Sequence, residues 1–177
     1  MNFVLRRSAA KVIARQATPA IRKLGRAAAK DKRFVRRLKR QERNSVKRIK
    51  SLQRSASFRF LNAAVRSKLV RALGFLMALY IHVITARWTE KTIRNMYSSD
   101  DLRSLDREAR KEYERKLKNA MQNRQAAEAK LDKYRSLLTL TDDLMKAQNE
   151  EDTNRIINKP KNKELLDLTD TLIDVEL

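Results

Sequence analysis

One apolar segment stands out from an otherwise charged chain. Between Arg71 and Arg87 lie fifteen residues without a formal charge, and their apolar side chains would occupy every side of a helix. Residues 34–70 and 102–145 differ from it, because their apolar residues recur mostly at spacings of three or four among charged ones. The pattern therefore predicts a uniformly apolar helix between two long amphipathic helical regions.

Glycine and proline are scarce in this chain. It has two of each, and none lies between Phe75 and Lys159. Strand-and-turn folds need such residues at their turns, whereas the abundant Ala, Leu, Lys, Arg, Glu and Gln favour helices. We therefore predict an all-α fold of extended long helices, with a coiled-coil-like segment, a single membrane-inserted helix and little compact globular core.

The same pattern divides the chain into five segments. They are a cationic helical arm (1–68), an apolar helix (69–88), a long amphipathic or coiled-coil-like helix (89–148), a polar linker (149–163) and an acidic amphipathic tail (164–177). Within the third segment, Ser98 or Ser99 followed by Asp100 and Asp101 is typical of a helix N-terminus. One long helix is expected from there to about residue 148.

An all-round apolar helix must be surrounded by apolar material. The thin stripes elsewhere in the chain are not expected to enclose it, which leaves a bilayer or an oligomeric bundle. Fifteen helical residues span about 22 Å against a bilayer core of about 30 Å, but the flanking Arg71 and Arg87 can snorkel. We predict membrane insertion ahead of burial in an oligomer. The predicted insertion residues are Leu73, Phe75, Leu76, Leu79, Ile81, Val83, Ile84 and the interfacial anchor Trp88.

The charge is distributed unevenly. The chain has a formal net charge of +21, and residues 1–71 alone hold 23 basic and 2 acidic residues, a net of +21. Such asymmetry indicates a polyanionic partner, which is an anionic membrane surface, nucleic acid or both. The candidate polyanion-binding residues are Arg33, Arg36, Arg37, Lys39, Arg40, Arg43, Lys47, Arg48 and Lys50.

From Tyr113 onward the apolar stripe is nearly heptad-like, with Arg124 and Thr141 as polar interruptions. A coiled coil or a helical hairpin is the natural interpretation. We predict that this stripe contacts a partner helix, in a homo-oligomer or in another helical subunit. The predicted contact residues are Leu117, Leu131, Tyr134 and Leu138.

The sequence offers little material for catalysis. It has no cysteine and a single histidine, so thiolate sites are excluded and one His cannot hold a zinc ion alone. It also lacks a glycine-rich phosphate loop and the H-E-x-x-H and G-x-S-x-G motifs. We therefore expect a protein that is not an enzyme, with no cofactor and no small-molecule substrate.

Three functions fit these features. The leading one is a membrane-active assembly protein, such as a virion-internal or virion membrane component of a phage or virus. The second is a mitochondrial inner-membrane coiled-coil protein, because the first thirty residues lack acids and resemble a transit peptide. The third is a soluble structural component of a nucleoprotein particle. We predict membrane association, and rank a virion or a bacterial inner membrane ahead of a mitochondrion.

Overall fold

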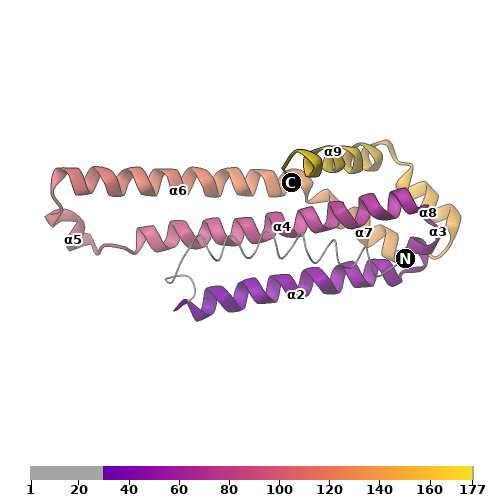
Figure 1. Ribbon diagram of the computed structural model, residues 1–177, viewed down its shortest axis with the longest axis horizontal. Coiled ribbons are helices and arrows are strands. Elements are labelled where there is room, and N and C mark those ends of the chain that lie inside the picture. The colour runs from indigo at the N-terminus through magenta and orange to yellow at the C-terminus, as the bar shows by residue number, and fades with distance from the viewer. Residues whose placement is uncertain (1–29, 177) are drawn as a thin grey trace.

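The computed structural model describes the backbone of residues 30–176 and the side chains of residues 30–171, and all regular structure in this part of the chain is helical. The all-α prediction is confirmed. Figure 1 shows an elongated bundle in which α4 runs through the middle. The acid-free N-terminal segment that resembles a transit peptide lies outside the described residues, except for Lys30.

The chain passes back and forth along one long axis. Helix α2 and helix α4 run in opposite directions, α6 returns along α4 after the short α5 at the tip, and α9 lies on α4 beyond the C-terminal end of α6 (Figure 1). The helices are α2 (Lys32–Arg54), α3 (Ala56–Phe60), α4 (Ala63–Arg94), α5 (Ser99–Ser104), α6 (Arg107–Tyr134), α7 (Ser136–Lys146), α8 (Glu150–Ile157) and α9 (Pro160–Glu176).

Short polar side chains set where the helices begin. Asn62 accepts a hydrogen bond of 2.9 Å from the backbone N–H of Val65 at the start of α4. At the start of α5, Ser98 and Asp101 form a capping box, so the helix start expected at Ser98 or Ser99 is confirmed. These caps satisfy backbone donors that have no partner within the first turn.

The helix expected from residue 99 to residue 148 is not continuous, and that prediction is wrong. Leu105 is extended, and Asp106 caps a new helix by accepting a hydrogen bond of 2.8 Å from the backbone N–H of Ala109. A second junction lies at Arg135, and Ala147 leaves the helical conformation. The cap at Asp106 therefore separates α5 from α6, whereas no side-chain cap marks the junction between α6 and α7.

Residues 149–163, which were expected to form a polar linker, are largely helical. Asn149 caps α8 by accepting a hydrogen bond of 2.8 Å from the backbone N–H of Asp152. Pro160 then takes the first position of α9. The backbone N–H that proline lacks would have had no partner within the helix at this position, so no hydrogen bond of the helix is lost. A helix therefore starts within this polar segment.

Helix α4 is enclosed by its own chain, so the expectation of little compact globular core is wrong. Helix α6 has the most extensive contact with α4, followed by α2 and α9. Each of these helices brings a thin apolar stripe, but the stripes approach α4 from different sides and together surround it. Buried residues from the covering helices are Phe34, Leu38, Ile49 and Leu52 of α2, Leu131 and Tyr134 of α6, Leu137, Leu140 and Leu144 of α7, and Leu165 and Leu166 of α9.

The residues predicted to enter a membrane lie in this core. Leu73, Phe75, Leu76, Leu79, Ile81 and Val83 are buried, and Ile84 and Trp88 are partly buried. Helix α4 is long and apolar enough to cross a membrane, yet 72% of its most apolar 18-residue window is buried inside the bundle. The other helices of the same chain therefore supply the apolar surroundings of α4.

Candidate polyanion interface

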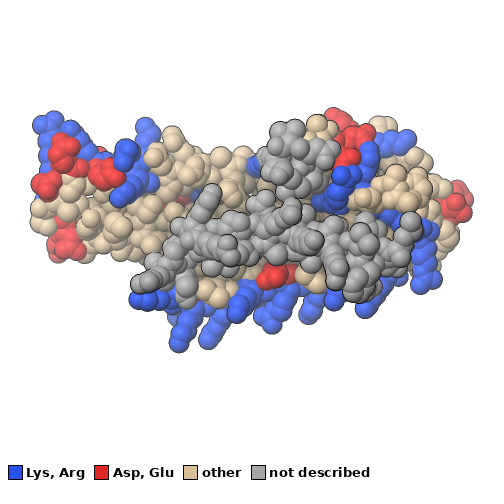
Figure 2. Space-filling model, viewed as in Figure 1, with Lys and Arg blue, Asp and Glu red and all other residues tan. Residues whose placement is uncertain are grey.

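One side of α2 is buried and the other is strongly cationic. Phe34, Leu38, Ser45, Ile49 and Leu52 are buried against the bundle. The opposite side carries basic residues at spacings of one, three or four, and all of them are exposed. We call this row the cationic stripe: Lys32, Arg36, Lys39, Arg40, Arg43, Lys47, Lys50 and Arg54. Figure 2 shows Lys and Arg projecting along the edge of the molecule where Figure 1 places α2.

The cations of α2 have few acidic neighbours. The helix contains eleven basic residues and one acidic residue, Glu42. Within the part of the chain that the structure describes, Arg48 is the only one of the eleven that forms an ion pair with a carboxylate. The other ten basic residues lie close together on one helix, so their positive charges repel one another. A bound polyanion would relieve this repulsion.

Arg48 differs from the other predicted polyanion-binding residues. Its Nη2 lies 2.6 Å from the Asp142 carboxylate, and it also donates hydrogen bonds to the backbone carbonyl of Leu138 (3.0 Å) and the Thr141 hydroxyl (3.1 Å). The structure therefore places Arg48 in the contact between α2 and α7. The remaining eight predicted residues are exposed: Arg33, Arg36, Arg37, Lys39, Arg40, Arg43, Lys47 and Lys50.

The predicted partner-helix contacts lie inside the molecule. Leu131 and Tyr134 are buried, and the Tyr134 ring meets the Phe75 ring edge-on with centroids 5.4 Å apart. Leu117 and Leu138 are partly buried. Helix α6 therefore pairs with α4 in a helical hairpin. Self-association of the chain stays a prediction.

Sequence reasoning missed a charged cluster between α4 and α6. Glu90 is only 7% exposed, and its carboxylate accepts hydrogen bonds from Arg94 (2.9 Å) and from Arg124 of α6. Arg124 also bonds Glu128 at 2.8 Å, and Glu128 accepts a hydrogen bond of 2.7 Å from Arg87. The polar interruption that Arg124 makes in the heptad-like stripe was the available signal, because a cation at a core-facing position needs an acidic partner.

The cluster keeps its carboxylates ionised. Burial alone raises the pKa of Glu90, but the hydrogen bonds from Arg124 and Arg94 outweigh it and hold the pKa below its ordinary value. The hydrogen bond from Arg87 lowers the pKa of Glu128 in the same way. The paired charges thus join α4 and α6 at this position.

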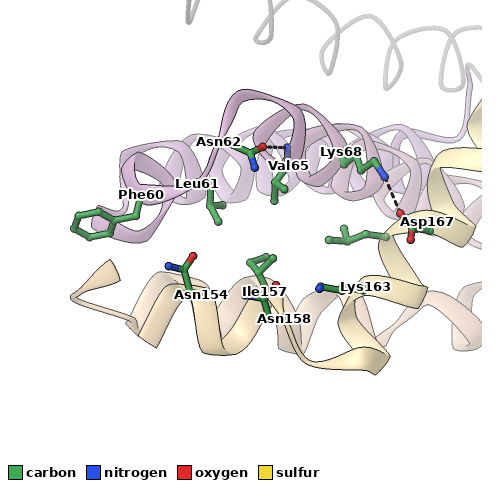
Figure 3. Close-up of a pocket in the computed structure, with 11 residues that line it drawn as sticks. Phe60, Leu61, Asn62, Val65, Lys68, Asn154, Ile157, Asn158, Lys163 and Asp167 are labelled. Carbon is green, nitrogen blue, oxygen red and sulfur yellow. Dashed lines mark hydrogen bonds and ion pairs between the residues drawn. The ribbon is translucent and has the colours of Figure 1, made fainter. Parts of the chain in front are cut away.

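A groove lies between the start of α4 and the helices α8 and α9 (Figure 3). It encloses about 420 Å³ and has an apolar floor that includes Leu61, Val65 and Ile157. Asn154 of α8 and Asn158, which follows the end of that helix, line the groove as well. Asp167 also lines the groove, and its carboxylate oxygen lies 2.7 Å from the Lys68 ammonium nitrogen. The groove thus offers amide and ammonium groups above an apolar floor.

Among residues 30–171, no group of three or more His, Cys, Asp or Glu side chains is arranged to hold a metal ion. Comparison of the chain with protein-family models, with curated proteins and with solved structures finds no match. The functional interpretation therefore depends on the charge and packing of the chain itself.

Proposed function

We propose that this protein is a non-enzymatic assembly protein that binds a polyanion through the cationic stripe of α2. One observation supports this most directly. Eight exposed basic residues follow one face of a 23-residue helix, and no carboxylate of the described residues pairs with them.

The physical basis of binding is the release of counterions. A polyanion holds a condensed layer of small cations, and each Lys or Arg that neutralises a phosphate sets some of them free. The buried side of α2 is packed on the bundle, so the row of cations is held in place before binding. This preorganisation lowers the entropic cost of association.

The proposed setting is an assembly that contains the polyanion, such as the interior of a virion. The basic excess lies in residues 1–71, whereas the rest of the chain is nearly neutral. One end of the sequence would then contact the polyanion, and the other would build the bundle that presents α2.

Heparin affinity chromatography tests the proposal. A stripe variant that carries Arg36→Gln, Arg40→Gln, Arg43→Gln and Lys47→Gln removes four exposed charges, and glutamine preserves helix propensity. We expect it to elute at a clearly lower NaCl concentration than the wild type, because fewer counterions are released.

A control variant removes four charges elsewhere. Arg107→Gln, Lys118→Gln, Lys159→Gln and Lys161→Gln change exposed residues outside α2 and lower the net charge by the same amount. We expect it to elute close to the wild type. Equal elution of the two variants would show that only net charge matters, and would reject α2 as the site.

Membrane insertion of α4 is a second candidate, favoured by the length and apolar character of that helix. Insertion requires the bundle to open, since α2, α6 and α9 cover α4. Trp88, the only tryptophan of the chain, reports on it. After incubation with anionic vesicles, brominated acyl chains should quench Trp88 fluorescence if α4 inserts, and unquenched fluorescence would exclude this candidate.

A further inference from the structure

We infer that the partner of the cationic stripe is the phosphate backbone of double-stranded nucleic acid, bound without reading the base sequence. The inference rests on the proposed function, since it names the polyanion that the same residues would bind. Three features of α2 support it: the chemistry of its exposed face, the spacing of its charges and the absence of exposed rings on this helix.

The exposed face of α2 offers charge without apolar contact. A helix that binds a membrane surface places an apolar face at the acyl boundary, with its cations beside it. The apolar side of α2 is already packed in the core, through residues such as Phe34, Ile49 and Leu52. The exposed residues of α2 are all charged or polar. Helix α2 is therefore suited to a solvated array of phosphates and unsuited to a bilayer interface.

The length and charge density of the stripe suit a duplex. Its 23 residues span about 34 Å at 1.5 Å per residue, so eight cations give about one positive charge per 4 Å. One strand of B-form DNA carries one phosphate per about 3.4 Å of helix axis. This length equals about one full turn of the duplex. A straight helix cannot follow one strand around that turn, but laid along the duplex it faces phosphates of both strands, so several of its cations can each contact a phosphate.

The uncharged residues on the exposed side of α2 argue against single-strand binding and base recognition. Single-strand binders stack bases on aromatic rings, and none of the exposed residues of α2 is aromatic. Asn44 and Ser51 are its exposed uncharged residues. Amide and guanidinium groups that read bases must reach the base edges in a groove, whereas a row of cations on the side of a bundle contacts phosphates first. We therefore expect affinity without sequence preference.

A three-ligand titration of the full chain tests this inference. The ligands are a 24-base-pair DNA duplex, a single strand of 24 nucleotides, and vesicles of phosphatidylcholine with phosphatidylglycerol at the same accessible phosphate concentration. Fluorescence anisotropy for the DNA and sedimentation for the vesicles give the affinities across a NaCl series. We expect the duplex to bind most tightly, with the same affinity for two unrelated sequences.

The stripe variant and the control variant then locate the contact. Each phosphate contact contributes about 0.9 to the slope of log K against log[salt], so the stripe variant should lower the slope for the duplex by up to about 3.6. The control variant should keep the slope of the wild type.

The outcomes separate the inference from the proposed function. Tighter binding to vesicles or to the single strand, with heparin elution still dependent on the stripe, would overturn the inference and leave the proposed function standing. Duplex affinity that depends strongly on base sequence would also overturn it. Heparin elution and duplex binding that are both unaffected in the stripe variant would reject both proposals.

Discussion

The indole N–H of Trp88 donates a hydrogen bond of 2.8 Å to the carboxylate of Asp31, across 57 positions of the sequence. The same carboxylate caps α2 by accepting hydrogen bonds of 3.0 Å from the backbone N–H groups of Arg33 and Phe34. The rings of Phe34 and Trp88 stack with centroids 4.8 Å apart. These contacts join the N-terminus of α2 directly to α4.

This contact predicts a specific order of stabilities. Asp31→Ala removes the cap and the acceptor for Trp88, so the melting temperature should fall by about 2–6 °C. Asp31→Asn keeps a good capping side chain and an oxygen that can accept from the indole, so its loss should be smaller. Trp88→Phe should lower the melting temperature of the wild type more than that of Asp31→Ala, because only the wild type has the hydrogen bond to lose. Additive effects in this double-mutant cycle, measured by circular dichroism, would contradict the coupling.

The buried carboxylate of Glu90 gives a second prediction. Glu90→Gln removes the carboxylate that pairs with Arg94 and one of the two that pair with Arg124, and we expect the melting temperature at pH 7 to fall by about 3–8 °C. Glu114→Gln is the matched control, because Glu114 is exposed and forms no ion pair among the described residues. A loss in the control as large as that in Glu90→Gln would argue against a special role for the cluster.

The same residue sets a pH dependence. The pKa of Glu90 is lower in the folded protein than in the unfolded chain, so its contribution to stability is complete above the unfolded pKa of about 4.3. It is lost as the pH falls through the folded pKa. The difference in melting temperature between the wild type and Glu90→Gln should therefore be largest near neutral pH and shrink below about pH 4.5. A difference that grows on acidification would contradict the direction of the shift.

A third prediction concerns what holds α9 on α4. The pairs Lys68–Asp167 (2.7 Å) and Arg71–Asp170 (2.6 Å) join the two helices, but ion pairs between side chains that solvent still reaches add little to stability. Leu166 is only 4% exposed. Leu166→Ala should therefore cost about 2–5 kcal/mol, whereas Asp167→Asn with Asp170→Asn should shift the melting temperature by about 2 °C or less.

Hydrogen exchange distinguishes the two contributions directly. Amide protection across α9 should fall in Leu166→Ala and persist in the double Asp→Asn variant. Protection that persists in Leu166→Ala and falls in the double Asp→Asn variant would mean that the ion pairs, and not apolar burial, hold α9 on α4.

Part of this fold is visible in the sequence. The scarcity of Gly and Pro predicted the helices, and the pair Ser98 and Asp101 predicted the start of α5. The break at Leu105 and Asp106 was missed, because a cap inside a periodic stretch competes with an apolar pattern that continues beyond it. Periodicity shows which residues share a face, and it does not show whether the helix is continuous.

The enclosure of α4 could not be derived from any single segment. Each apolar stripe is thin, and only the arrangement in space shows that α2, α6 and α9 cover different sides of one helix. The position of Arg48 is a similar case. It lies three residues after Ser45 and four before Leu52, at the edge of the buried face, but its acceptors come from α7, ninety or more residues away. Composition identified the cationic face, and tertiary contacts decided which of its members point inward.

Single-cysteine labelling tests the enclosure of α4 most directly, because the chain has no native cysteine. Ala72→Cys and Ala78→Cys place small thiols at positions that are 1% and 7% exposed, and His82→Cys places one on an exposed position of the same helix. In lipid-free buffer at low protein concentration, a polar maleimide should label His82→Cys rapidly and the two buried sites at least tenfold more slowly, with rates independent of protein concentration. Rapid labelling at all three sites in buffer, with protection only after vesicles are added, would contradict burial within the bundle and favour insertion of α4 into a membrane.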